Sequence, residues 1–177
     1  MSKIIRIDSL HFGDRSKCSC NATGINLVVW FLGCDIHCQG CHNYEYWDFD
    51  NPKFEDFSDK HVSIIIDEMI AYSEIYSGLS ILGGEPFSTK NIDDVIYLCE
   101  IFKQRFPNKH IWIWSGHTFE WLKNQTNEYG KKIQNLFDLC DVLVDGPFIN
   151  DLRNVSLKFR GSSNQRIIDL KTGKEID

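Results

Sequence analysis

Three cysteines lie within eight residues and could hold a metal centre. Cys34, Cys38 and Cys41 follow the spacing C-x3-C-x2-C, directly after Gly33. Thiolates are natural ligands of iron–sulfur clusters, and each of three close cysteines can bind one iron of a [4Fe–4S] cubane. No fourth cysteine lies beside them. The spacing therefore predicts a cluster in which one iron keeps a position open for a small-molecule ligand.

A zinc ion is the alternative occupant of this loop. His37 or His42 would then be the fourth ligand beside the three thiolates. Small zinc sites usually pair two C-x2-C units at longer separation, which favours the iron–sulfur interpretation. Three unrelated buried cysteines would not explain why the loop directly follows an apolar, strand-like segment.

A second candidate loop contains two adjacent glycines. Gly83, Gly84 and Glu85 precede Pro86 and follow a short apolar segment at 79–82. Glycines allow backbone groups to approach a ligand closely, because they carry no side chain. Alone, such a pair indicates only a tight turn. Downstream of the cysteine loop, it indicates a binding loop.

The segments around these loops alternate between strand and helix patterns. Helices are predicted to begin after the caps Ser58 and Asn91, from Thr118, and again before Leu139. Strands are predicted at 25–32, 79–82, His110–Trp114 and 142–144, with a last short apolar segment at 167–168. This alternation predicts right-handed βαβ units and a parallel sheet.

The predicted strands end in the residues that could do chemistry. Function in parallel sheets gathers at the carboxyl ends of the strands, so we expect four loops to share one rim. The four loops are Gly33-Cys34, Gly83-Gly84-Glu85-Pro86, Ser115-Gly116-His117 and Asp145-Gly146-Pro147. With so few strands a barrel would be incomplete. The predicted fold class is therefore α/β, a partial (β/α) barrel that is open along one side.

Composition sets the broad class of the protein. A chain of 177 residues, 42% hydrophobic and 25% charged, predicts one domain spanning 1–177. The net charge of −6 and the lack of a basic run argue against a nucleic-acid partner. The N-terminus does not read as a signal peptide, and the longest apolar run, 27–32, is too short to cross a membrane. The expected location is the cytoplasm.

The cysteine loop and the glycine loop together resemble the radical S-adenosylmethionine superfamily. That resemblance implies the superfamily's partial barrel, a [4Fe–4S] cluster, and S-adenosylmethionine bound through the open iron. Gly83, Gly84 and Glu85 match the superfamily's GGE motif, which meets the cofactor's amino group. Gly40 departs from many members, which have an aromatic residue before the third cysteine.

A narrower resemblance covers residues 24–169 and points to the activating enzymes of anaerobic (class III) ribonucleoside-triphosphate reductase. It implies a glycyl radical formed on that reductase and an electron donor such as flavodoxin or ferredoxin. It also implies cofactor contacts from Gly40, Cys41, His42, Gly83, Gly84 and Glu85. The matching pieces are 33–43, 83–86, 111–119, 141–148 and 160–166.

Other functions stay open on the sequence alone. The chain could be a radical S-adenosylmethionine enzyme acting on a small molecule or nucleotide, an activase of another glycyl radical enzyme, or a zinc or electron-transfer module without catalysis. Asp145 could bind a ribose hydroxyl, close a turn or cap a helix, and the segment 160–166 could shape a loop or touch cofactor or partner. The aromatic residues within 44–49 could shield the cluster from water, form a docking surface for a partner or lie at the edge of the hydrophobic core. Cys18, Cys20, Cys99 and Cys140 are expected to be ordinary thiols.

Overall fold

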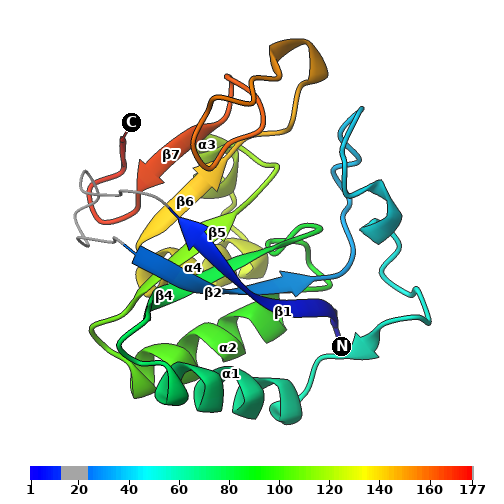
Figure 1. Ribbon diagram of the computed structural model, residues 1–177. Coiled ribbons are helices and arrows are strands. Elements are labelled where there is room, and N and C mark those ends of the chain that lie inside the picture. The colour runs from blue at the N-terminus through cyan, green and yellow to red at the C-terminus, as the bar shows by residue number, and fades with distance from the viewer. Residues whose placement is uncertain (13–23, 177) are drawn as a thin grey trace.

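The computed structural model describes residues 1–12 and 24–176, which form a mixed α/β fold on one eight-stranded sheet (Figure 1). The strand order is β3-β1-β2-β4-β5-β6-β7-β8. Within the described ranges the outer strands β3 and β8 do not pair with each other, so the sheet is not closed. The predicted α/β class is confirmed. The strands are β1 (Lys3–Phe12), β2 (Gly24–Phe31), β3 (Glu55–Asp56), β4 (Tyr76–Gly83), β5 (His110–Trp114), β6 (Val142–Asp145), β7 (Arg166–Asp169) and β8 (Lys174–Glu175).

The centre of the sheet is the predicted parallel unit. β2, β4, β5 and β6 run parallel, and the pairs Val29↔Ile81 and Ile81↔Ile113 hold their register. The strands that flank this parallel unit, β1 and β7, were not predicted to be antiparallel. β1 pairs antiparallel with β2, and β7, which contains the apolar segment 167–168, pairs antiparallel with β6. Pairing between distant segments depends on tertiary context, which local patterns do not encode.

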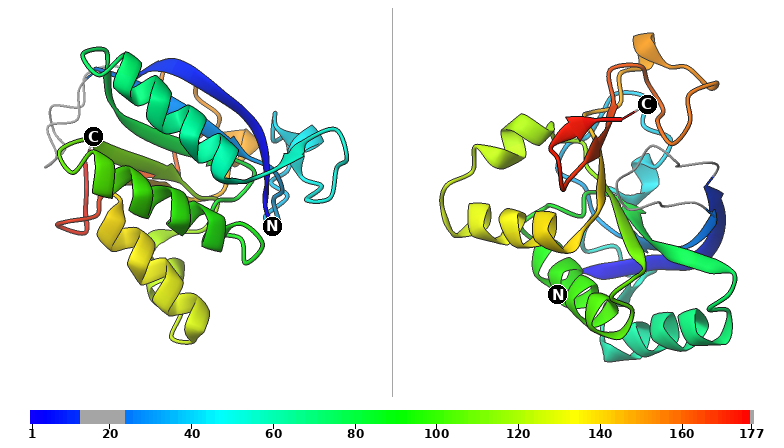
Figure 2. Two further views of the ribbon diagram at one scale, coloured as in Figure 1. Left: turned by 90° about the horizontal axis from the view of Figure 1, so that it is seen from below. Right: turned by 90° about the vertical axis from the view of Figure 1, so that its left-hand side faces the viewer.

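The helices α1 (Asp59–Ala71), α2 (Ile92–Arg105) and α4 (Glu128–Leu139) lie on one side of the sheet, while the shorter α3 (Phe119–Lys123) follows β5 (Figures 1 and 2). Each of the three long helices buries an apolar stripe against alternate strand residues. The resulting core includes Ile65, Val95, Leu136, Leu79 and Ile81. This packing fixes the carboxyl ends of the parallel strands at one edge.

The other face of the sheet carries a second, smaller apolar cluster. Trp112, Val142, Val144 and Ile167 are buried there, with Trp114 and Phe159 packed against them. Alternation along each strand sends every second side chain to this face. Every helix of the described residues is too short or too polar to span a bilayer.

Candidate functional site

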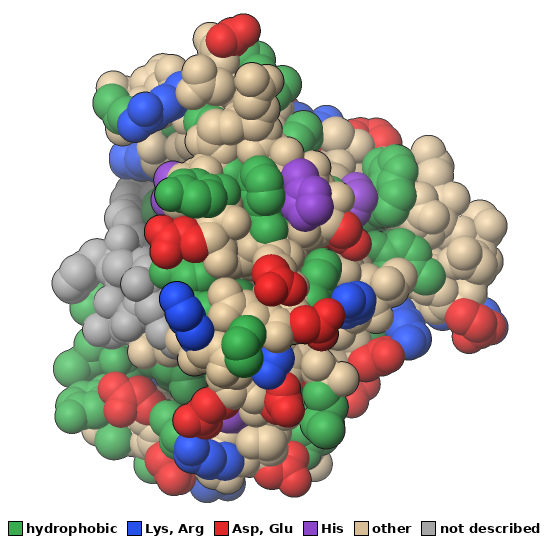
Figure 3. Space-filling model, turned by 90° about the vertical axis from the view of Figure 1, so that its right-hand side faces the viewer, with side chains coloured by type: hydrophobic (Ala, Val, Ile, Leu, Met, Phe, Trp, Pro, Cys, Tyr) green, Lys and Arg blue, Asp and Glu red, His purple; other side chains and the backbone are tan. Residues whose placement is uncertain are grey.

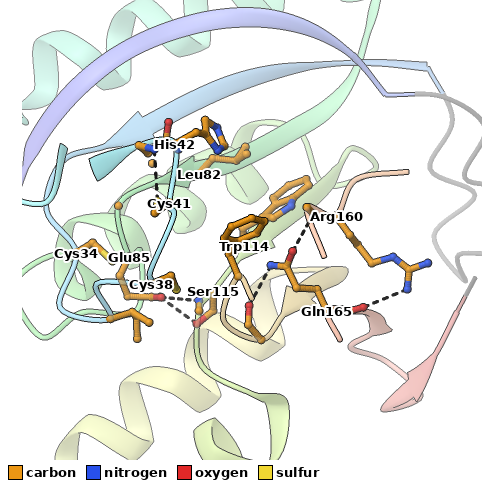
Figure 4. A pocket seen from close by; sticks show the side chains of 18 of the residues that line it. Cys34, Cys38, Cys41, His42, Leu82, Glu85, Trp114, Ser115, Arg160 and Gln165 are labelled. Carbon is orange, nitrogen blue, oxygen red and sulfur yellow. Dashed lines mark hydrogen bonds between the residues drawn. The ribbon is translucent and has the colours of Figure 1, made fainter. Parts of the chain in front are cut away.

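One cavity of about 680 Å³ lies where the parallel strands end (Figure 4). Residues from all four predicted loops line it, including Ser115, Gly116 and Gly146, so these loops meet at one rim as expected. The cavity is also lined by every residue that the sequence assigned to a cluster or cofactor: Cys34, Cys38, Gly40, Cys41, His42, Gly83, Gly84 and Glu85.

The cysteine loop leaves β2 through a glycine. Gly33 has φ +92°, a backbone conformation that favours glycine. Its amide donates to the carbonyl of Tyr46 at 2.9 Å, and the Cys34 amide donates to the carbonyl of Trp47 at 3.1 Å. A Cβ at Gly33 would lie 1.9 Å from the ring of Phe49. Residues 46–49 therefore hold the start of the cysteine loop through two backbone hydrogen bonds and through the ring of Phe49.

Cys34 is the most enclosed of the three cysteines, with 8% of its surface exposed. Burial raises the pKa of the Cys34 thiol to about 11, although the backbone amides of Ile36 and His37 favour the thiolate. Without a bound metal, the Cys34 thiol therefore keeps its proton at neutral pH. A metal that replaces this proton would find two amide donors already directed at the sulfur.

Cys38 and Cys41 are half-buried and line the same cavity as Cys34. Burial raises the pKa of Cys38, which the backbone amide of Phe148 partly opposes. The amide of Asn43 donates to Sγ of Cys41 at 3.4 Å. Hydrogen bonds to cysteine sulfurs are a regular feature of iron–sulfur sites, where they tune the reduction potential.

The cysteine arrangement suits a cluster better than a single ion. A zinc ion needs its ligands to converge on one point at about 2.0–2.3 Å. Within 1–12 and 24–176, no three His, Cys, Asp or Glu side chains converge in that way. A cubane places one cysteine on each of three irons, so its three sulfurs stand apart around the cluster and do not converge on one atom. His37 and His42 are both exposed, and the ring of His37 packs on Trp47 at 4.6 Å.

The glycine loop lies directly against the cysteine loop. The amide of Gly84 donates to the carbonyl of Phe31 at 2.9 Å, and the amide of Glu85 donates to the carbonyl of Gly33 at 2.7 Å. A Cβ at Gly84 would lie 1.9 Å from the carbonyl oxygen of Gly33. The sequence explained this glycine by the space that a cofactor needs. In the structure, it permits contact between the two loops.

Glu85 connects the glycine loop to the loop after β5. Its carboxylate is fully buried and accepts hydrogen bonds from the amide of Gly116 at 2.7 Å, the amide of Phe87 at 3.0 Å and the hydroxyl of Ser115 at 3.0 Å (Figure 4). Burial raises the pKa of Glu85 to about 7 against these three donors. The carboxylate thus positions two loops of the cavity.

Asn91 is a second connecting residue, which sequence reasoning assigned only to a helix cap. It does precede α2, but its side chain makes no capping hydrogen bond. Instead Nδ2 donates at 3.0 Å both to the carbonyl of Leu32 and to the carbonyl of Glu85. An asparagine four residues before an apolar helical stripe indicates a cap locally, and only the folded loops show its other role.

We expect Asn91→Asp to loosen both loops. The substitution keeps the shape but turns a donor toward two buried carbonyls into an acceptor, and each orphaned group costs about 1–3 kcal/mol. The free energy of unfolding should fall by roughly 2–6 kcal/mol, and iron bound per chain should fall with it. Denaturant titration and iron analysis measure both. The exposed control Asn124→Asp should change neither, and a full iron content in Asn91→Asp would contradict this role.

The remaining candidate residues have mainly structural contacts. The buried carboxylate of Asp145 accepts from the amide of Phe119, the first residue of α3, at 2.6 Å and pairs with Arg166, which matches a helix-capping role better than ribose binding. Within 160–166, Gln165 binds the amides of Gly161 and Ser162 and so shapes its own loop. Cys99 and Cys140 are buried core residues, as expected. Cys18 and Cys20 lie outside the described residues.

Comparisons with known proteins agree with this site. A family model described as a 4Fe-4S single cluster domain matches residues 20–168. The anaerobic ribonucleoside-triphosphate reductase-activating protein of Salmonella typhimurium is 31% identical over 153 residues, or 85% of this chain and 92% of that protein. The Escherichia coli K12 protein of that name gives the same figures. The protein of that name from Enterobacteria phage T4 is 31% identical over 83% of this chain and 85% of its own.

Proposed function

This chain belongs to the family of anaerobic ribonucleoside-triphosphate reductase-activating proteins, and from that membership we propose that it forms a glycyl radical on such a reductase under anaerobic conditions. Cys34, Cys38 and Cys41 would hold a [4Fe–4S] cluster. One observation carries the proposal: the three cysteines and the Gly83–Glu85 loop line the same cavity.

The bound cluster would supply the one electron needed for reductive cleavage of S-adenosylmethionine, and the hydrogen atom would come from a glycine α-carbon of the reductase. An external donor of the flavodoxin or ferredoxin class would return that electron. The products would be methionine, 5′-deoxyadenosine and the glycyl radical, so atoms and electrons balance. Three cysteine ligands would leave one iron without a protein ligand and so free to bind S-adenosylmethionine.

The role of the protein itself is to hold the cluster and S-adenosylmethionine in fixed positions relative to each other. The backbone of Gly83 and Gly84 lines the cavity beside Cys34 and is available to the cofactor's amino-acid end. Glu85 and Asn91 lock that backbone through buried hydrogen bonds. Rigid positioning of this kind matters because a displacement of about 1 Å can cost about 10²-fold in rate.

The open sheet fits the partial barrel of the radical S-adenosylmethionine superfamily, and we propose that residues 1–177 form one domain of that type. Cys38 and Cys41 line the cavity and are partly exposed, so the cavity is open to solvent. A macromolecular substrate suits such a site, because small-molecule pockets usually bury most of their ligand.

The test is a radical transfer assay under argon. The reconstituted protein, S-adenosylmethionine and a reductant are mixed with the candidate reductase, and electron paramagnetic resonance should show a glycyl doublet on the reductase. The doublet should vanish when the radical-bearing glycine is changed to alanine. Brisk cofactor cleavage with no radical on the reductase, together with consumption of a nucleotide or metabolite, would instead support a small-molecule enzyme.

A further inference from the structure

A projecting segment beside the cavity exposes apolar side chains. This rim segment, residues 149–155, contains the short helix η2 (Asn150–Leu152) and follows β6. Ile149 is 40% exposed, Leu152 42% and Val155 85%. Three apolar side chains are therefore exposed within seven positions, and clusters of exposed apolar side chains are a feature of interaction sites.

The rim segment is held in a defined shape. Its Arg153 forms a β-bridge with Ser162, and the amide of Asn154 donates to the carbonyl of Gly161 at 3.1 Å. The side chain of Asn150 lies over Gly40, where a Cβ would meet its Oδ1 at 3.3 Å. These contacts fix the segment against the cysteine loop before any partner binds, which lowers the entropic cost of docking.

The rim segment also forms part of the cavity wall. Arg153, Asn154 and Val155 line the same cavity as the three cysteines. The segment after β6 and the segment after β2 project beyond the same end of the sheet, in orange and cyan in Figure 1. A peptide that reaches the cysteines from outside would therefore pass along the rim segment.

The rim segment and the residues that follow it, 149–160, carry a net positive charge, unlike the whole chain. The chain has a net charge of −6, whereas Arg153, Lys158 and Arg160 outnumber the one acidic residue of this stretch, Asp151. Within the described ranges, none of these three cations forms an ion pair. Lys and Arg side chains lie together with hydrophobic ones on this loop at the top of Figure 3.

We propose that the rim segment is the docking surface for the glycine-bearing segment of the reductase. This inference rests on the proposed function, since the hydrogen donor is then a main-chain atom of another protein and its chain must cross the rim. Val155 and Leu152 would contact apolar side chains beside that glycine, and Arg153 would face acidic groups. Exposed apolar anchors with a basic neighbour match such an interface.

The test is the double variant Leu152→Glu/Val155→Glu, measured as glycyl radicals formed per S-adenosylmethionine cleaved. This coupling ratio distinguishes a docking defect from a catalytic defect. Damage to the cavity lowers radical formation and cofactor cleavage together, whereas a docking defect lowers radical formation alone. We expect the ratio and the affinity for the reductase each to fall by about tenfold or more. Ile64→Glu/Ile70→Glu is the matched control, since these α1 residues are 44% and 46% exposed and do not line the cavity.

The outcomes separate the two hypotheses. An unchanged ratio and affinity in the Leu152/Val155 variant would overturn the docking surface, and so would a loss in the α1 control of the same size. If the isolated variant changes its own association state while its ratio stays unchanged, the rim binds a second copy of this chain instead. Absence of any radical with the unmodified protein would overturn the proposed function itself. Iron per chain verifies folding, and Val155→Ala, which removes only exposed methyl groups, should lower the ratio in the same direction.

Discussion

Replacing Cys34, Cys38 or Cys41 by alanine is expected to abolish the cleavage of S-adenosylmethionine. Each thiolate would hold one iron, so a cluster left with two protein ligands should be labile. Iron and sulfide per chain should fall well below the four of each in the reconstituted protein, and the brown absorption near 400 nm should disappear. The amides directed at Cys34 and Cys38 cannot replace the missing ligand, because they bind sulfur rather than iron.

Two other cysteines provide matched controls. Cys99 and Cys140 are buried in the core away from the cavity, and Cys99→Ala and Cys140→Ala should keep the cluster. Alanine is the better replacement there, because serine would bury a hydroxyl, which is more polar than a thiol, in an apolar core. A full cluster in Cys38→Ala would remove that residue from the ligand set.

Gly84→Ala is the second substitution with a large expected effect. Its Cβ would lie 1.9 Å from the carbonyl oxygen and 2.3 Å from the carbonyl carbon of Gly33, and neither backbone atom can turn aside as a side chain could. The cysteine loop must therefore move. We expect both iron content and cofactor affinity to fall, with cleavage reduced by about 10²-fold or more, since a shift of about 1 Å suffices for such a loss.

This result differs from the one expected from the sequence, which predicts that Gly84→Val weakens cofactor binding and leaves the cluster intact. Gly173→Ala is the control: its φ of +67° also disfavours alanine, but its Cβ would meet nothing closer than 3.8 Å and it does not line the cavity. A strain of about 1–2 kcal/mol at that site should leave the cluster in place. Normal iron content in Gly84→Ala with weak cofactor binding would restore the sequence-based explanation.

The sequence by itself determined the central fold and predicted the chemistry proposed for the site. The spacing of Cys34, Cys38 and Cys41 carries the cluster hypothesis, since local spacing limits which metal centre a short loop can wrap. Apolar periodicity identified the parallel strands and the long helices, because burial of one face leaves a regular mark on the sequence. β5 agrees with its predicted bounds at both ends.

Only the tertiary structure decided how the loops are held together. The antiparallel strands β1 and β7, the buried carboxylate of Glu85 and the contacts of Asn91 all join segments far apart in the chain. Asn91 resembles a helix cap and Gly84 resembles a cofactor contact when each is viewed locally. In the structure, Gly84 packs against the backbone of Gly33, and Asn91 joins the carbonyl of Leu32, more than fifty residues away, to that of Glu85. Long-range contacts of this kind leave no local periodicity, because they arise only when packing brings the strand ends to one edge.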